Sequence, residues 1–386
     1  PFGTATLLAD LDDPLAALDA AQATGLVGGP ATLVPAQARS RLADPMVRAA
    51  VLQVMGVAAV GALHLRAAEL ATDPVQRLRH RTAATPVPDR PLADELAAAA
   101  RRLSAEGAWA EAADLFAQAA RLTAEPLDHD RRLTQALDAR LADGDCRSAG
   151  ALVPGVESLR ETARRDVALA YLAILRGRST EARVRLDRAW NIVNNHRESE
   201  VGATIAQRFV LHHLIRGQGR SVVEWADRAI DLGGVDSPAG VEAASIRGLG
   251  LAWSGRPGEA VAAYDELAQR VRSGAQVQRV QMGRGWLELG RGDLESARSQ
   301  LQTAVSMAGL GGSKRITLWA LGWLGRVHFL SGDWEQALTV VDEGRRLAAE
   351  SGIDLVTGLL VWTAAQIHSL RGDWAAAQRA VDALPG

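Results

Sequence analysis

Hydrophobic positions along most of this chain follow a helical period, and the same pattern returns after a glycine about every 38 residues. The two clearest copies are GDWEQA at 332–337 and GDWAAA at 372–377. Eight glycines, separated by 37, 33, 40, 38, 37, 40 and 40 residues, mark the copies: Gly107, Gly144, Gly177, Gly217, Gly255, Gly292, Gly332 and Gly372. Each copy predicts an amphipathic helix, a tight turn at the glycine and a second amphipathic helix.

Small and large side chains alternate in a fixed register around these turns. The residue five after the glycine is Ala in seven of eight copies, and Val222 is the exception. Four residues later, one helical turn along the same face, a larger residue such as Tyr264 or Leu301 usually follows. In three first helices a second glycine precedes the turn by seven residues: Gly248, Gly285 and Gly325. This register predicts that paired helix backbones approach closely.

The register resembles the tetratricopeptide repeat and covers roughly residues 91–386. The resemblance implies an all-α, right-handed helical solenoid of about eight helix pairs over residues 92–386. Because the mean period exceeds the 34 residues of the standard unit, we expect irregular helix lengths.

Residues 1–81 predict a small winged-helix-like connector. Short helices break at Asp13-Pro14, residues 31–35 suggest one strand of a wing, and Asp44-Pro45 starts a longer helix. The apolar run 49–63 is too short to span a bilayer and predicts a buried helix. Without a basic face, the unit is favoured as a rigid connector over a DNA-binding one. Residues 82–91, with three prolines, predict a linker to the repeats.

Three segments of the connector resemble the large ATP-binding LuxR-family regulators of actinobacteria: 41–51 (RLADPMVRAAV), 63–70 (LHLRAAEL) and 73–80 (DPVQRLRH). Asp44 replaces the usual His of the first segment. In such regulators a signal-transduction ATPase precedes the connector and a helix-turn-helix follows the repeats. The chain begins at Pro1 and stops as the eighth hairpin completes, so we expect a piece of a longer protein. The resemblance implies that ATP binds only in the missing ATPase domain, with no cofactor in this segment.

Composition bears on the class of binding partner and on the cellular compartment. The 43 basic and 45 acidic residues give a net charge of −2, which offers no electrostatic footprint for nucleic acid. Cys146 is the only cysteine and cannot form an internal disulfide, so we expect a reducing cytoplasm and no membrane.

Catalytic and metal-binding patterns are missing from the sequence. A phosphate-binding loop needs Gly-Lys-Ser/Thr, but the only lysine, Lys314, lies between Ser313 and Arg315. His212 and His213 are adjacent and point apart on a helix. His213, His328 and His368 each fall four residues before a turn glycine, which favours packing over ligand contact. We therefore expect no enzyme.

The tryptophans carry the site prediction. Trp109, Trp334 and Trp374 lie two after their glycines and predict packing between hairpins. Trp323 and four other tryptophans lie on first helices, which the resemblance places on the concave surface. Indexed from each turn glycine, an aromatic and basic strip emerges as the candidate ligand or partner site: Trp253, Arg279, Met282, Trp286, Trp319, Arg326, Trp362 and Gln366. The alternative is that these large side chains only fill a wide groove.

The leading interpretation is the sensor region of a cytoplasmic LuxR-family regulator, binding a small-molecule inducer or a protein or peptide on the concave face. Such a region touches no nucleic acid itself, and a homo-oligomer is compatible with it. The alternative function is a constitutive tetratricopeptide scaffold for a protein partner.

Overall fold

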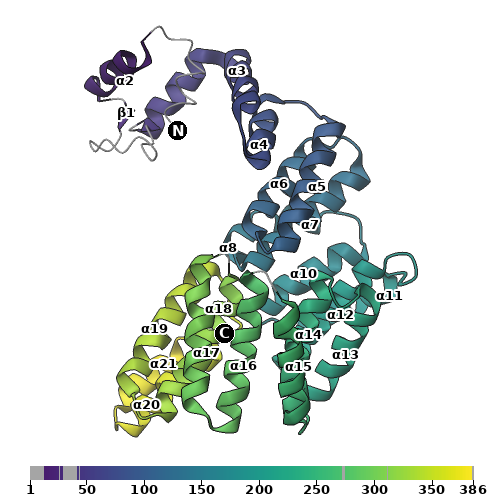
Figure 1. Cartoon of the computed structure of the whole chain (residues 1–386), viewed down its shortest axis with the longest axis vertical. Helices are drawn as coiled ribbons and strands as arrows, with labels where there is room; N and C mark the ends of the chain where they lie inside the picture. The colour runs from purple at the N-terminus through teal and green to yellow at the C-terminus, as the bar shows by residue number, and fades with distance from the viewer. Residues whose placement is uncertain are drawn as a thin grey trace. The chain divides into compact units, whose positions relative to one another are not determined.

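The computed structural model describes residues 13–25, 27–28, 41–42, 44–271, 274–310 and 312–384. These residues are mostly helical, with one pair of two-residue strands (Figure 1). The chain forms two compact units: residues 1–99 with 118–129, and residues 100–117 with 130–386.

The described part of the first unit begins with a helix and a pair of two-residue strands. Its elements are α2 (Pro14–Ala23), β1 (Val27–Gly28), β2 (Arg41–Leu42), α3 (Pro45–Leu70), α4 (Pro74–Ala84), and parts of α5 (Arg90–Glu106) and α6 (Trp109–Arg121). The strands pair antiparallel, Val27 with Leu42 and Gly28 with Arg41. As predicted, Pro14 opens α2, and Asp13 Oδ1 accepts the amide of Ala16 at 3.0 Å. The predicted strand at 31–35 lies outside the described residues.

The predicted burial of residues 49–63 is wrong. They form part of α3, where Val54 is 88% exposed and only Ala67 and Ala68, near the end, are buried. The reason is that α4 is much shorter and packs on α3 without covering its first half. By length and composition α3 could cross a membrane. However, Gly56 has φ 73° and ψ 162°, which breaks α3 into 45–55 and 57–70. Each piece is shorter than the about 20 residues that a span needs.

The second unit is a row of antiparallel helix hairpins. Besides the other parts of α5 and α6, it contains α7 (Pro126–Asp143) from residue 130 onward, and it contains these elements whole: α8 (Cys146–Ala149), α9 (Val153–Glu157), α10 (Ala163–Leu175), α11 (Ser179–Ile192), α12 (Ser199–Leu214), α13 (Gly219–Gly233), α14 (Pro238–Trp253), α15 (Pro257–Arg270), α16 (Gly274–Arg291), α17 (Leu294–Ser306), η1 (Met307–Leu310), α18 (Lys314–Leu330), α19 (Trp334–Ser351), α20 (Thr357–Leu370) and α21 (Trp374–Asp382). First helices pack on first helices along the row, from α10 through α12, α14, α16 and α18 to α20.

The eight turn glycines behave as predicted. All have positive φ, between 67° and 86°, a conformation that L side chains rarely adopt. After four of them an aspartate caps the second helix. In α19, for example, Asp333 Oδ1 accepts the amide of Gln336.

The small-residue register is also confirmed. Six of the seven alanines after the turns have no exposed surface: Ala112, Ala149, Ala182, Ala260, Ala297 and Ala337. The glycines of the first helices face the large residues of the second. A Cβ at Gly248 would lie 2.6 Å from the ring of Tyr264, and one at Gly285 would lie 2.6 Å from Leu301. Glycine is therefore required at both contacts.

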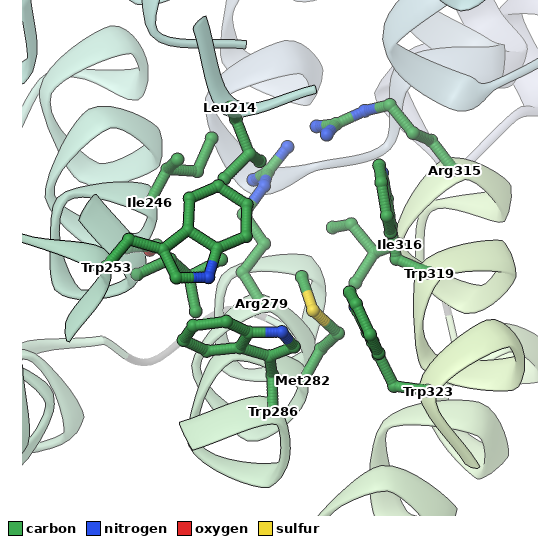
Figure 2. A pocket seen from close by; sticks show the side chains of 12 residues that line it. Leu214, Ile246, Trp253, Arg279, Met282, Trp286, Arg315, Ile316, Trp319 and Trp323 are labelled. Atoms are coloured by element: carbon green, nitrogen blue, oxygen red, sulfur yellow. The ribbon is translucent and has the colours of Figure 1, made fainter. Parts of the chain in front are cut away.

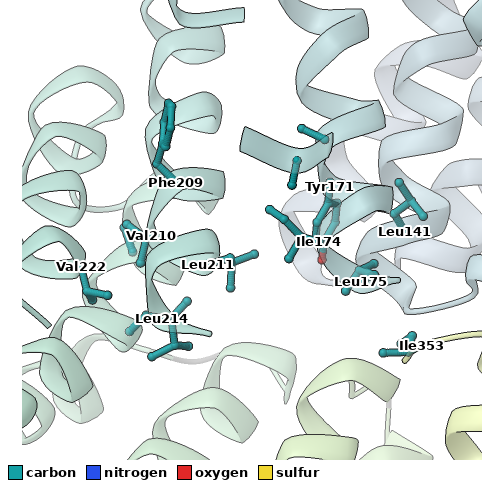
Figure 3. Packing of buried hydrophobic residues seen from close by; sticks show 14 of the residues in the cluster. Leu141, Tyr171, Ile174, Leu175, Phe209, Val210, Leu211, Leu214, Val222 and Ile353 are labelled. Carbon is teal, nitrogen blue, oxygen red and sulfur yellow. The ribbon is translucent and has the colours of Figure 1, made fainter. Parts of the chain in front are cut away.

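Late hairpins of the second unit also pack against early ones. The carbonyl of Leu175 at the end of α10 accepts the amides of Asp354 and Leu355, at 3.0 and 3.1 Å. Ile353, in the loop between α19 and α20, is fully buried in the core cluster that contains Leu141 and Leu175 (Figure 3). Further polar contacts join the same regions: Arg147 to the Ala349 carbonyl, Ser313 to the Ala142 carbonyl, and Lys314 to Asp143. The row of hairpins thus closes on itself.

The packing predicted for Trp374 is wrong. Its side chain is 70% exposed, and Val381 on the same helix is also exposed. Among the described elements, α21 packs chiefly on α20, so its outer face is uncovered. Trp109 and Trp334, on earlier hairpins, are partly buried.

Candidate functional site

A pocket opens between the first helices α12, α14, α16 and α18 of the second unit (Figure 2). It holds about 530 Å³ of space, its open mouth included. The lining is mostly apolar: Leu214, Ser245, Ile246, Leu249, Trp253, Arg279, Met282, Trp286, Arg315, Ile316, Trp319 and Trp323. A concave, largely apolar space with a few polar groups is typical of small-molecule sites.

Three of the four helices present one face each to the pocket. Residues at i, i+3 and i+7 line it on α14 (246, 249, 253), α16 (279, 282, 286) and α18 (316, 319, 323). That spacing places side chains on one stripe of a helix. The last member of each triplet is a tryptophan.

The tryptophans form a continuous wall. Trp253 and Trp286 meet edge to face with ring centroids 5.3 Å apart, and Trp286 and Trp323 do so at 6.2 Å. Trp319 stacks on Trp323, also at 6.2 Å. These are the geometries that aromatic pairs prefer. Trp286 is nearly buried, whereas Trp253, at the mouth, is 40% exposed.

A buried charge network adjoins this wall. Glu242 on α14 contacts Arg315 Nη2 through Oε1, and its Oε2 lies 3.4 Å from Arg279 Nη2. Arg208 on α12 lies 3.8 Å from the same carboxylate and donates to Asp138 at 3.0 Å. All three guanidinium groups and Glu242 are buried.

Aromatic rings position two of these guanidinium groups. The Arg208 guanidinium lies over the ring of Tyr171 at 3.5 Å, and that of Arg279 lies 5.2 Å from the ring of Trp109. Figure 2 shows the guanidinium groups of Arg279 and Arg315 close together beside Leu214.

The electrostatics of the network are unbalanced. Burial by itself raises the pKa of Glu242, but Arg279, Arg315 and Arg208 together lower that pKa to about 2. Burial lowers the pKa of Arg279, and the attraction of Glu242 offsets this only in part because Arg315 and Arg208 repel the same charge. The network therefore holds an ionised carboxylate among more positive charge than it can neutralise.

The structure brings together five of the eight predicted site residues in this pocket: Trp253, Arg279, Met282, Trp286 and Trp319. The other three, Arg326, Trp362 and Gln366, form a separate cluster on α18 and α20. Arg326 stacks on Trp362 at 3.9 Å and donates to Gln366. Trp362 is 49% exposed there.

Indexing from the turn glycines missed several pocket residues because the lining runs diagonally. Trp253, Trp286 and Trp323 precede their glycines by two, six and nine residues, about one helical turn more in each successive hairpin. Trp323 could have been found by looking for a tryptophan shifted by one turn per repeat. Glu242 and Arg315, 73 residues apart, give no such signal.

Histidine, cysteine and acidic side chains outside the pocket do not group into a metal site in the described part of the chain. No group of three or more His, Cys, Asp or Glu suited to a metal ion occurs among the described residues. Cys146 is buried, and burial raises the pKa of its thiol to about 12. His213 is buried and bonded to Gln218 at 2.6 Å, in keeping with its predicted packing role.

No protein-family model and no curated protein matches the sequence. Among solved structures, the chain is similar to a Rap protein complexed with Competence and Sporulation Factor. The identity is 14%, the TM-score is 0.57, and the match covers 76% of this chain and 86% of that one. The chain is also similar to a Signal Transduction ATPase with Numerous Domains protein, with a tetratricopeptide repeat sensor, from Pyrococcus horikoshii. There the identity is 14% and the TM-score 0.45, over 97% of this chain and 58% of that one. The chain thus has a tetratricopeptide-like helical fold.

Proposed function

We propose that this chain is the sensor region of a cytoplasmic, LuxR-type ATP-dependent transcription regulator, and that its inducer binds in the tryptophan-lined pocket. Residues 1–81 are then a winged-helix-like connector, 82–91 a linker and 92–386 a right-handed solenoid of about eight helix pairs. The region is neither an enzyme nor a DNA-binding unit. ATP and DNA are bound by domains outside this chain.

The observation that carries the proposal is the pocket itself. Its walls come from four consecutive first helices, so one ligand touches four hairpins at once. The twelve lining residues include four tryptophans and two buried arginines, which supply flat apolar surface and directed polar contacts.

A ligand here can change the arrangement of the hairpins. Arg315 and Ile316 of the pocket directly follow Ser313 and Lys314, which contact α7. The pocket is therefore linked through α18 to the contacts that close the row. A ligand that fits one spacing of the four helices better than another shifts the population toward that spacing. Such a shift is what a sensor passes to its output domains.

The alternative is a constitutive scaffold that binds a protein or peptide. The cluster of Arg326, Trp362 and Gln366 favours it, because Trp362 is half exposed and outside the pocket. An exposed tryptophan with a stacked arginine is typical of protein-interaction surfaces.

The regulator assignment is tested on the complete gene. We expect a Gly-Lys-Ser/Thr phosphate-binding loop encoded upstream of this segment and a helix-turn-helix downstream. A gene that encodes neither contradicts the regulator proposal while leaving the pocket untouched.

The pocket is tested by tryptophan fluorescence during titration with fractionated metabolite extracts. We expect a saturable change that Trp253→Ala abolishes, since Trp253 forms the mouth of the pocket. Trp374→Ala, at an exposed tryptophan on α21, is the matched control and should retain the change. A response lost in Trp362→Ala but kept in Trp253→Ala supports the scaffold instead.

A further inference from the structure

The charge network beside the pocket contains one positive charge too many. Three guanidinium groups, those of Arg208, Arg279 and Arg315, face the two carboxylates of Glu242 and Asp138. Asp138 accepts from Arg208 at 3.0 Å, so Arg279 and Arg315 share Glu242. Glu242 is the only carboxylate within ion-pair distance of either in the described part of the chain. Leaving such a buried charge unpaired is costly.

The same two arginines have unused hydrogen-bond donors. The Nε atoms of Arg279 and Arg315 are buried and donate to no acceptor in the described residues. Both side chains line the pocket. A buried donor without a partner is unfavourable, so an acceptor that reaches these guanidinium groups from the pocket is favoured.

The rest of the wall disfavours a strongly polar anion. Apart from the arginines and Ser245, every lining residue is aliphatic, aromatic or Met. The Ser245 hydroxyl already donates to the Val241 carbonyl at 2.8 Å. A single negative charge matches the excess, whereas a doubly charged phosphate overcompensates it.

We propose that the ligand of this pocket is a small organic acid whose carboxylate pairs with Arg279 and Arg315, while its flat or branched apolar body lies against the tryptophans. The inference rests on the proposed sensory role of the pocket and gives it a chemical class. Glu242 then acts as an internal competitor, since the same two guanidinium groups that hold it receive the ligand.

The test is calorimetric titration of the whole chain with matched pairs of compounds. The probes are phenylacetate, 4-methylpentanoate and 2-naphthoate, each beside its uncharged primary amide, with inorganic phosphate as the bare anion. We expect at least one acid to bind about tenfold or more tightly than its amide, as a charge-assisted hydrogen bond provides. We expect phosphate to give no saturable heat.

Substitutions in the charge network test whether it causes the preference for the acid over the amide. Arg279→Gln should remove the acid–amide difference, and Arg279→Lys should keep part of it. Glu242→Gln should strengthen acid binding because the competitor loses its charge, a change that mere loss of structure does not produce. Arg284→Gln, on the same helix but paired with Asp265 outside the pocket, is the matched control and should bind as the parent does.

The outcomes separate the two proposals. Equal binding of acids and amides, weakened by Trp253→Ala, overturns the organic acid and leaves the sensory pocket standing. Weaker acid binding in Glu242→Gln also overturns it. If no acid binds to a parent that remains folded by circular dichroism, the organic acid is overturned, and the fluorescence titration with Trp253→Ala decides separately whether the pocket binds a small molecule.

Discussion

At the residue scale, the glycines of the first helices set how closely two helices approach. A Cβ at Gly285 would lie 2.6 Å from Leu301 Cγ and 3.2 Å from the Ala297 carbonyl oxygen. Gly290, on the same helix α16, has nothing within 4 Å of the corresponding position. Alanine at Gly285 therefore tests close packing, and alanine at Gly290 tests helix propensity alone, within the same helix.

We predict opposite effects of alanine at these two positions. Gly285→Ala should lower the free energy of unfolding by about 1–3 kcal/mol through overpacking. Gly290→Ala should raise it by about 0.5–1 kcal/mol, because alanine loses less backbone entropy than glycine. Urea denaturation of both variants measures the difference. Similar values for the two variants would mean that α16 and α17 do not touch at Gly285.

Buried histidine predicts a pH dependence of stability. His212 on α12 is buried, and burial, followed by His213, Arg216 and Arg183, lowers its pKa from 6.5 to about 4, against the opposite pull of Asp187. Because the folded pKa lies below the unfolded one, the unfolded chain takes up the proton first. The contribution of His212 to the free energy of unfolding is therefore complete above pH 7, and it is lost as the pH falls from 6.5 toward 4.

The expected loss from His212 is roughly 3 kcal/mol over that window. Urea unfolding at a series of pH values measures it, and His212→Gln should flatten the curve between pH 6.5 and 4.5. The control His196→Gln, at an exposed histidine, should leave the slope unchanged. Glu242 adds a further loss only below its ordinary pKa of 4.5, down to about 2. A His212→Gln curve as steep as the parent's would assign the dependence elsewhere.

At the element scale, the hairpins were predictable because their signals are local. Turn glycines, capping aspartates and small residues one turn apart all act within one repeat, so the sequence displays each of them directly. The error on α3 has the opposite origin. Its apolar composition is a local property, but its burial depends on a partner helix, and α4 is too short to cover it.

The pocket was only partly predictable for the same reason. The tryptophans were visible as large residues on first helices. Their grouping depends on the shift between neighbouring helices, about one turn per hairpin, which no single repeat encodes. Because of that shift, Trp323 contacts Trp286, whereas Trp362 lies elsewhere, against Arg326. The partners of Glu242 lie 34, 37 and 73 residues away along the chain, so the charge network follows from tertiary packing alone.

The loop between α19 and α20 should contribute to stability as a core element does. Ile353 has no exposed surface, and its Cδ1 lies 3.3 Å from where a Cβ at Gly144 would be. Ile353→Ala should lower the free energy of unfolding by about 2–5 kcal/mol, the range for a buried large-to-small change. Val381→Ala, at a half-exposed valine on α21, should change it by less than about 0.5 kcal/mol. Hydrogen exchange of Ile353→Ala should show loss of protection in α7 and α10, although both helices are distant from residue 353 in the sequence. Loss confined to α19 and α20 would contradict the closure.

At the scale of the whole molecule, closure of the second unit bears on how it unfolds. In an open row each hairpin contacts only its neighbours, so terminal hairpins can unfold while others stay intact. Here α10 is bonded to the segment before α20, and α7 to the start of α18. Opening either end breaks contacts at both, so partly folded states lose more than one interface.

All ten tryptophans lie between residues 109 and 374, and all belong to the second unit. Tryptophan fluorescence therefore reports that unit alone. We predict a single urea transition, with the same midpoint in two reporter variants. One exchanges Trp190 and Trp225 for Phe and reports chiefly the later hairpins. The other exchanges Trp334, Trp362 and Trp374 for Phe and reports chiefly the hairpins up to α18. In a closed row both ends are lost together, because neither retains its packing without the other. Midpoints that differ between the reporters, or a second step in either, would show that the hairpins unfold from one end. A ligand in the pocket could then stabilise α12–α18 without being sensed at α7 or α20.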